Sequence, residues 1–125
     1  MTMSTDEKIE QEIQDKGLTA ARVTPAQIES VIASEWYLNP HDSLLYEAAA
    51  CNVPELVPVP ELRLLTLCVL VLKNGFTVVG KSACASAANF DAEVGRKVAR
   101  QDAVNQIWAL EGYLLKQRIH EAGQG

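Results

Sequence analysis

Two arginines near the start of a long amphipathic segment have the spacing of a phosphate-binding pair. Arg96 and Arg100 are four residues apart, so a helix would carry both guanidinium groups on one face. A guanidinium holds a phosphate through paired hydrogen bonds. The alternative is a solvated helix face on which the arginines pair with Glu93 or Asp102. The residues alone leave both interpretations open.

Four other side chains are candidates for binding an anion or a nucleobase. Phe76 follows a turn glycine, where its ring is either exposed for stacking or packed against a helix. Asn89 is either a helix N-cap or a hydrogen-bonding group for a base. Arg22 and Arg63 are isolated cations beside structured segments, and each is either a phosphate ligand or simply solvated.

Known catalytic signatures do not occur in the sequence. It contains no Walker loop, no GxSxG or HExxH motif and no kinase motif set. Neither His41 nor His120 has a candidate nucleophile beside it in the sequence, and the positions of the acidic residues are typical of helix caps or solvated faces. We therefore expect no enzyme, no cofactor and no metal site. Hydrolysis of a cyclic nucleotide by Asp91, Glu93 or a histidine is the weakest alternative.

Composition and charge narrow the class of protein. The chain has 125 residues, of which 48% are hydrophobic, so we expect one domain over 1–125. Its formal net charge is -5, whereas proteins that coat DNA or RNA are usually basic, so we expect no DNA or RNA partner. Three widely spaced cysteines predict neither a disulfide framework nor a zinc site. The polar start is unlike a signal peptide, and the longest apolar run is too short to cross a membrane. These features predict a cytoplasmic protein without a membrane partner.

The candidate residues must be positioned by a small set of elements. Thr24, Pro25 and Gln27 form the start signal of a helix, and Asn39-Pro40 ends its pattern. Prolines at 54, 58 and 60 favour an irregular connector, in which residues 44–50 could form one or two helical turns. The predicted order is a peripheral polar helix within 1–19, a helix at 24–37, a connector at 40–60, a hairpin at 62–85 and a long helix at 90–121.

The hairpin is the most specific local prediction. Asn74-Gly75 between two apolar runs favours a two-residue type I′ turn, which would pair Val71 with Val78 and Val69 with Gly80. Both faces of this ribbon are then apolar. A lone two-stranded ribbon cannot bury two faces, so a second copy of the chain is the simplest cover for one of them. The fold class predicted is α+β: an antiparallel hairpin packed with an N-terminal helix and a long C-terminal helix.

Two sequence blocks resemble a phage and prophage family long described only as an uncharacterised phage protein. They read LTLCVLVLKNGFTVVGKSACAS and NFDAEVGRKVARQDAVNQIWALEGYLL, and the helix VTPAQIESVIASEWY precedes them. The similarity covers roughly residues 20 to 119. The family includes the first Thoeris anti-defence protein.

That resemblance implies a sponge, which binds an immune signal without cleaving it. The signal is the glycocyclic ADP-ribose of Thoeris, and some relatives also hold cyclic di- and trinucleotides of CBASS. It further implies a homo-oligomer built from dimers, up to a hexamer, in the cytoplasm of an infected bacterium. Its pockets use an aromatic ring, an asparagine and arginines, for which Phe76, Asn89, Arg96 and Arg100 are the matches by type. Arg22 and Arg63 are candidates for a second pocket. The other function left open is a module that binds a host or phage protein.

Overall fold

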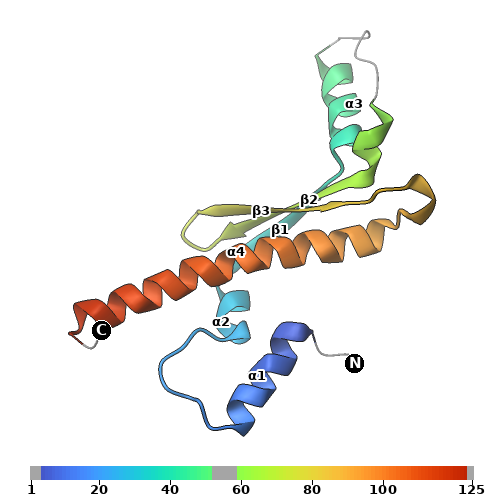
Figure 1. The fold of residues 1–125 in the computed structure, drawn as a ribbon. Helices are drawn as coiled ribbons and strands as arrows, with labels where there is room; N and C mark the ends of the chain where they lie inside the picture. Colours follow the sequence, from blue (N-terminus) through green and yellow to red (C-terminus); the bar gives the residue numbers. More distant parts are fainter. Residues whose placement is uncertain (1–3, 52–58, 124–125) are drawn as a thin grey trace.

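The chain folds around a three-stranded antiparallel sheet crossed by one long helix (Figure 1). The computed structural model describes residues 4–51 and 59–123. It confirms the predicted α+β class, with a helix at the N-terminus and a long helix at the C-terminus. The elements are α1 (Thr5–Asp15), α2 (Pro25–Ser30), β1 (Ile32–Leu38), α3 (Pro40–Ala50), the short 3-10 helix η1 (Pro60–Leu64), β2 (Leu65–Leu72), β3 (Thr77–Ala83), the 3-10 helix η2 (Ala87–Asn89) and α4 (Ala92–Glu121).

The helix predicted at 24–37 is wrong beyond its first turns. Thr24 caps α2 as expected, but α2 ends at Ser30 and residues 32–38 form strand β1. In this stretch Trp36 and Leu38 alternate with Glu35 and Tyr37 on the two faces, which is the period of a strand. Pairing with β2 favours the strand, because the hydrogen bonds and side-chain contacts with an apolar neighbouring strand stabilise the extended backbone. The sheet therefore has three strands where the sequence predicts two.

The connector predicted at 40–60 is also partly wrong. Its first half is helix α3, which begins at Pro40 and is capped by Asn39, whose side-chain oxygen accepts the backbone N–H groups of His41 and Asp42. A proline at the first helical position lacks only an N–H that would be unpaired there, so it starts a helix as readily as it ends one. The prolines at 54 and 58 lie outside the described residues.

The hairpin is confirmed, but its register is shifted by one residue. Leu72 pairs with Phe76 through its N–H, and Gly75 donates to the Leu72 carbonyl, which makes a three-residue loop. Gly75 has φ +88, the left-handed conformation that this loop requires at its last position. Val69 consequently pairs with Val79, and Leu70 with Val78. A shift of one residue exchanges the two faces of β3, so Val78 points into the core and Val79 away from it.

The core lies between the sheet and α4. Cys68, Leu70 and Val78 from the strands are buried against Ala99, Ala103 and Ile107 of α4. The helix approaches β3 very closely at Gly80, where an added Cβ would lie 2.1 Å from the Ala99 carbonyl oxygen. Small residues on both elements thus set the distance between the helix and the sheet.

Helix α4 matches its predicted extent and spans the whole molecule. Asp91 caps it by accepting the Val94 N–H, so Asn89 is not its N-cap. Figure 1 shows its C-terminal turns extending past the hairpin, while α1 and α2 lie on the α4 side of the sheet. Helix α1 lies within the range expected for a peripheral polar helix and has no buried residue. Within 4–51 and 59–123, no helix has both the length and the apolar character that a membrane span needs.

Two backbone groups on the outer edge of β3 are bonded by side chains of α4. The Lys81 N–H donates to Asp102 Oδ2 at 2.9 Å, and Gln106 Nε2 donates to the Val79 carbonyl. These outward backbone groups would otherwise be unpaired at the edge of the sheet. The edge formed by β1, which pairs with β2 on its inner side, is the opposite end of the sheet.

Candidate functional site

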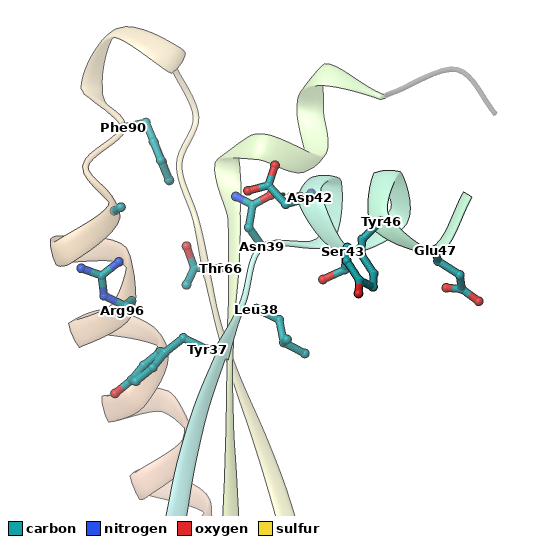
Figure 2. Close-up of a pocket in the computed structure, with 11 residues that line it drawn as sticks. Tyr37, Leu38, Asn39, Asp42, Ser43, Tyr46, Glu47, Thr66, Phe90 and Arg96 are labelled. Atoms are coloured by element: carbon teal, nitrogen blue, oxygen red, sulfur yellow. Dashed lines mark hydrogen bonds between the residues drawn. The ribbon is translucent and has the colours of Figure 1, made fainter. Parts of the chain in front are cut away.

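An open groove of about 810 Å³ lies at the C-terminal end of β1, between α3 and the beginning of α4 (Figure 2). Its volume is within the range of pockets that hold small organic ligands. It is built by the end of β1, the first two turns of α3, the beginning of β2, and the start of α4 with Phe90 just before it. It is lined by Tyr37, Leu38, Asn39, Asp42, Ser43, Tyr46, Glu47, Thr66, Phe90, Ala92 and Arg96.

The α4 wall of the groove carries its positive charge. Arg96 is exposed and, among the described residues, makes no ion pair or hydrogen bond. Phe90 stands on the same wall, just before the helix begins, with its ring half-buried. A free guanidinium beside an aromatic ring is suited to a phosphate attached to a planar group.

The α3 wall carries the negative charge. Asp42 and Glu47 are exposed carboxylates on this helix, and Tyr46, 80% exposed, lies between them. Carboxylates accept hydrogen bonds and donate none when ionised. A ligand spanning the groove would therefore meet an anion-binding group on one side and hydrogen-bond acceptors on the other.

Tyr37 is held between the walls by a chain of polar contacts that ends on α4. Its hydroxyl donates to Glu35 Oε2 at 2.6 Å, and the same carboxylate accepts from Arg100 Nε at 3.0 Å. Figure 2 shows the ring of Tyr37 reaching from β1 toward α4. Burial and the hydrogen bond to Glu35 raise the pKa of Tyr37. The bonds from Tyr37 and from Arg100 lower the pKa of Glu35, so the tyrosine stays neutral and the glutamate charged near pH 7.

The guanidinium of Arg100 is bound by two carboxylates of the same chain. Besides Glu35 it binds Glu29 of α2 through both terminal nitrogens, at 3.0 and 2.8 Å. Its side chain is 27% exposed, and the paired bonds to Glu29 raise its pKa further above the usual value. Arg100 thus joins α2, β1 and α4, and it does not share the groove with Arg96.

Arg63 contacts the first residues of α3 and does not line the groove. Its Nε donates to Nε2 of His41 at 3.4 Å, and its carbonyl accepts from the side chain of Asn39. His41 is 2% exposed, and its other ring nitrogen contacts Asp42 at 3.2 Å. A neutral imidazole that accepts at Nε2 and donates from Nδ1 satisfies both contacts.

The remaining predicted site residues lie away from the groove. Phe76 is at the tip of the hairpin, 53% exposed, at the opposite end of strands β2 and β3 from Thr66. Asn89 is exposed in η2 and does not line the groove. Arg22 binds Glu10 of α1 through two hydrogen bonds, the longer 2.6 Å. Within one chain, the structure brings only Arg96 of the six predicted residues into this groove.

Sequence reasoning missed the aromatic and acidic lining of the groove. Tyr37 falls in the stretch predicted as helix, and Asp42, Tyr46 and Glu47 fall in the stretch predicted as connector. Asn39-Pro40 can also start a helix, with asparagine as the cap and proline at the first position. That interpretation would have placed Asp42 and Tyr46 on one helical face.

The groove combines one cationic side chain, aromatic rings and carboxylates. Among the described residues, no group of three or more His, Cys, Asp or Glu side chains is placed to hold a metal ion. Its contacts offer charge, stacking surface and hydrogen-bond acceptors.

A family model matches residues 23–119, which include every strand, α3 and nearly all of α4. This is the phage protein (N4 Gp49/phage Sf6 gene 66) family. The chain belongs to it. Membership in the N4 Gp49/Sf6 gene 66 family confirms the predicted resemblance to a phage protein family. No curated protein and no solved structure matches the chain. The matched range contains the whole groove, whereas α1 lies outside it.

Proposed function

We propose that this phage protein is a sponge that binds cyclic nucleotide immune signals and withholds them without cleaving them. The ligands are the glycocyclic ADP-ribose of Thoeris and, as further candidates, the cyclic di- and trinucleotides of CBASS. The observation that carries the proposal is the groove with aromatic rings around it and, on one wall, an arginine that pairs with none of the described residues. The choice of immune signal comes from the resemblance of the two sequence blocks.

The charge pattern of the groove supports a nucleotide over a simple anion. Arg96 is opposed by Asp42 and Glu47, so a ligand with phosphate alone would be repelled by the α3 wall. A nucleotide has phosphate oxygens for Arg96 and also donates hydrogen bonds through ribose hydroxyls and the adenine amino group. Both walls are then satisfied by one ligand.

The aromatic side chains support recognition of a base. Tyr37, Tyr46 and Phe90 all line the groove, and stacking of a base on an aromatic ring is worth about 1–3 kcal/mol. A sponge competes with a host receptor, so it needs tight binding, and nanomolar affinity corresponds to about -12 kcal/mol. The open groove offers part of the enclosure that such affinity requires.

The structure changes the role that we propose for Arg100. It contacts Glu29 and Glu35, and through Glu35 it fixes the hydroxyl of Tyr37. We therefore assign Arg100 to positioning the floor of the groove, and Arg96 to the phosphate.

Isothermal titration calorimetry with glycocyclic ADP-ribose and with cyclic di- and trinucleotides tests the proposal. We expect Arg96→Ala to weaken binding of the preferred ligand by at least tenfold. Lys97→Ala is the matched control, because it removes one positive charge from the next residue, which pairs with Glu93 and does not line the groove. No binding of any of these ligands to the folded wild-type protein would sink the proposal.

Recovery of the ligand separates a sponge from an enzyme. The complex is heated to unfold the protein, and the released ligand is examined by mass spectrometry. We expect an intact ligand in an amount that matches the bound fraction. A cleaved product that accumulates with time would instead indicate a hydrolase. Failure to bind nucleotides together with a stable protein partner in a pull-down would favour the interaction module.

A further inference from the structure

A buried histidine lies next to the α3 wall of the groove. His41 is 2% exposed and does not line the groove, whereas the next residue, Asp42, does. Burying an imidazole costs free energy unless its nitrogens are hydrogen-bonded, and an apolar side chain would fill the same space without that cost. Both ring nitrogens of His41 have partners: Arg63 Nε lies 3.4 Å from Nε2, and Asp42 Oδ1 lies 3.2 Å from Nδ1. A buried polar ring with a partner on each side indicates a role beyond packing.

The partners of His41 fix the direction of its two hydrogen bonds. The guanidinium of Arg63 can only donate, so Nε2 of a neutral ring accepts and the ring proton lies on Nδ1. Nδ1 then donates to Asp42 Oδ1. The ring cannot turn over without losing both contacts, so it presents this one donor to Asp42.

Asp42 therefore has one carboxylate oxygen that is held and one that is available. Its backbone N–H donates to Asn39 Oδ1 at 3.3 Å, which fixes the residue in the first turn of α3. Oδ1 is held by His41, and Oδ2 has no hydrogen-bond partner among the described residues. Figure 2 shows Asp42 across the groove from Arg96. The groove thus contains an acceptor that is oriented before a ligand binds, which lowers the entropy lost on binding.

Glu47, the other carboxylate of this wall, lacks such support. Its side chain makes no hydrogen bond or ion pair with the described residues, and it is longer and more flexible than an aspartate. Ordering Glu47 on a ligand would cost more conformational entropy than using the available oxygen of Asp42. Of the two acidic residues, Asp42 is the better placed to select a ligand.

We propose that Asp42 determines specificity in the groove by accepting a hydrogen bond from a ribose hydroxyl, and that His41 positions its carboxylate. A carboxylate oxygen can only accept, so it pairs with a hydroxyl and repels a phosphate. Arg96 on the opposite wall has the reverse preference, so the two residues orient a nucleotide with its phosphate toward α4 and its sugar toward α3. The inference rests on the proposed function and names the group of the nucleotide that the α3 wall recognises.

Calorimetry with cyclic di-AMP and with its 2′-deoxy analogue tests the assignment, because the two probes share their phosphates and bases and differ in the hydroxyls. We expect the wild-type protein to bind the ribose form at least about tenfold more tightly, since the analogue leaves the acceptor without a partner. The side chain of Asp42 is 80% exposed, which keeps the expected factor far below that of an enclosed site.

The preference for the ribose form should disappear in Asp42→Ala. Glu47→Ala is the matched control, because it removes the same charge from the same wall and should leave the preference unchanged. The ratio of the two affinities separates a hydrogen bond to the hydroxyl from a general effect of charge, which would alter the binding of both probes equally.

Variants at His41 test the positioning role. Asparagine places a side-chain N–H close to the position of Nδ1, so His41→Asn should keep most of the preference, whereas His41→Leu should lose it. A histidine that served packing alone would give the opposite order, because leucine fills a buried apolar site better. Arg63→Met removes the donor to Nε2 at an exposed residue and should also reduce the preference, so the test does not depend on whether His41→Leu folds.

Equal binding of the two probes by the wild-type protein overturns the inference, as does a full preference that survives Asp42→Ala. In both cases the protein still binds nucleotides, and the proposed function stands. A preference that survives both His41→Leu and Arg63→Met overturns the role of His41. If neither probe binds, glycocyclic ADP-ribose replaces them, and a loss of affinity in Asp42→Ala no larger than in Glu47→Ala overturns the inference. If no nucleotide binds, the proposed function fails and this inference fails with it.

Discussion

Arg100 has two carboxylate partners, whereas Arg96 has none among the described residues. The two lie about one helical turn apart on α4 and have the same chemistry, but their neighbours give them different tasks. Arg100 faces Glu29 and Glu35, and its side chain is 27% exposed. Arg96 faces the groove. An arginine pair in a sequence is therefore not a phosphate site until the carboxylates around it are known.

Neutral substitutions separate these two tasks. Arg100→Met should lower the free energy of unfolding by about 1 kcal/mol, a value reduced by the exposure of both glutamates. Arg96→Met should change it by less than about 0.5 kcal/mol, as is usual for surface positions. Urea unfolding followed by circular dichroism measures both. An equal loss of stability in the two variants would contradict the assignment.

The contact between Arg22 and Glu10 makes the attachment of α1 sensitive to acid. The paired hydrogen bonds from Arg22, with a bond from Gln14, lower the pKa of Glu10 from 4.5 to about 2. A carboxyl whose pKa is depressed on folding stabilises the folded state above its unfolded pKa, and that stability is lost as pH falls. Helix α1 should therefore detach as the pH falls from about 4.5 toward 2.

Trp108 reports on this detachment, because its indole N–H donates to Asp6 of α1 at 3.2 Å. In a Trp36→Phe background, its fluorescence should change across that acid range. In Glu10→Gln the contact no longer titrates through Glu10, so the transition should be smaller. An identical acid transition in both chains would mean that another group controls α1.

At the scale of elements, the sequence predicts those whose signals are local. The hairpin carries its own turn residues, and α4 carries a long helical stripe, so both are found with nearly correct bounds. β1 depends on a partner strand about thirty residues away, and no local pattern in 32–38 shows that this partner exists. The groove follows the same division: Arg96 on α4 is predicted, whereas Tyr37 and Tyr46 belong to elements that were not.

The packing of α4 on β3 depends on the missing side chain of Gly80. A Cβ there would lie 2.1 Å from the Ala99 oxygen and 2.3 Å from the Ala103 nitrogen, both backbone atoms. Gly80→Ala should destabilise the fold by roughly 1–3 kcal/mol or more, because the helix must move away from the strand. Thermal unfolding measures the loss.

Gly112 provides the matched control for Gly80. It lies in the interior of α4, and a Cβ there would meet nothing within 4 Å. Gly112→Ala should stabilise the protein by about 0.5–1 kcal/mol, since alanine favours the helix. If Gly80→Ala were also neutral or stabilising, the close approach of α4 to β3 would be wrong.

At the scale of the whole molecule, α4 takes part in the core, in the groove and in the edge of the sheet. It covers the sheet through Ala99, Ala103 and Ile107, forms one wall of the groove through Arg96, and closes the edge of β3 through Asp102 and Gln106. Different sides of the one helix therefore pack on the sheet, line the groove and bond the edge of β3.

Removing the edge contact should affect solubility more than stability. Asp102→Ala leaves the Lys81 N–H without its acceptor, which should cost about 1 kcal/mol and expose the β3 edge. Turbidity on prolonged warming below the unfolding midpoint should rise faster than in the wild type. Asn105→Ala, on the same helix but bonded only to Gln101 among the described residues, should behave as the wild type.

The contacts of Asp102 and Gln106 also bear on whether another chain can pair with the outer edge of β3. A strand from another chain that approached β3 would find the Val79 carbonyl and the Lys81 N–H already bonded. A sheet edge with both rows of outward groups free is a template for pairing with another chain, and occupying some of those groups makes such pairing less favourable.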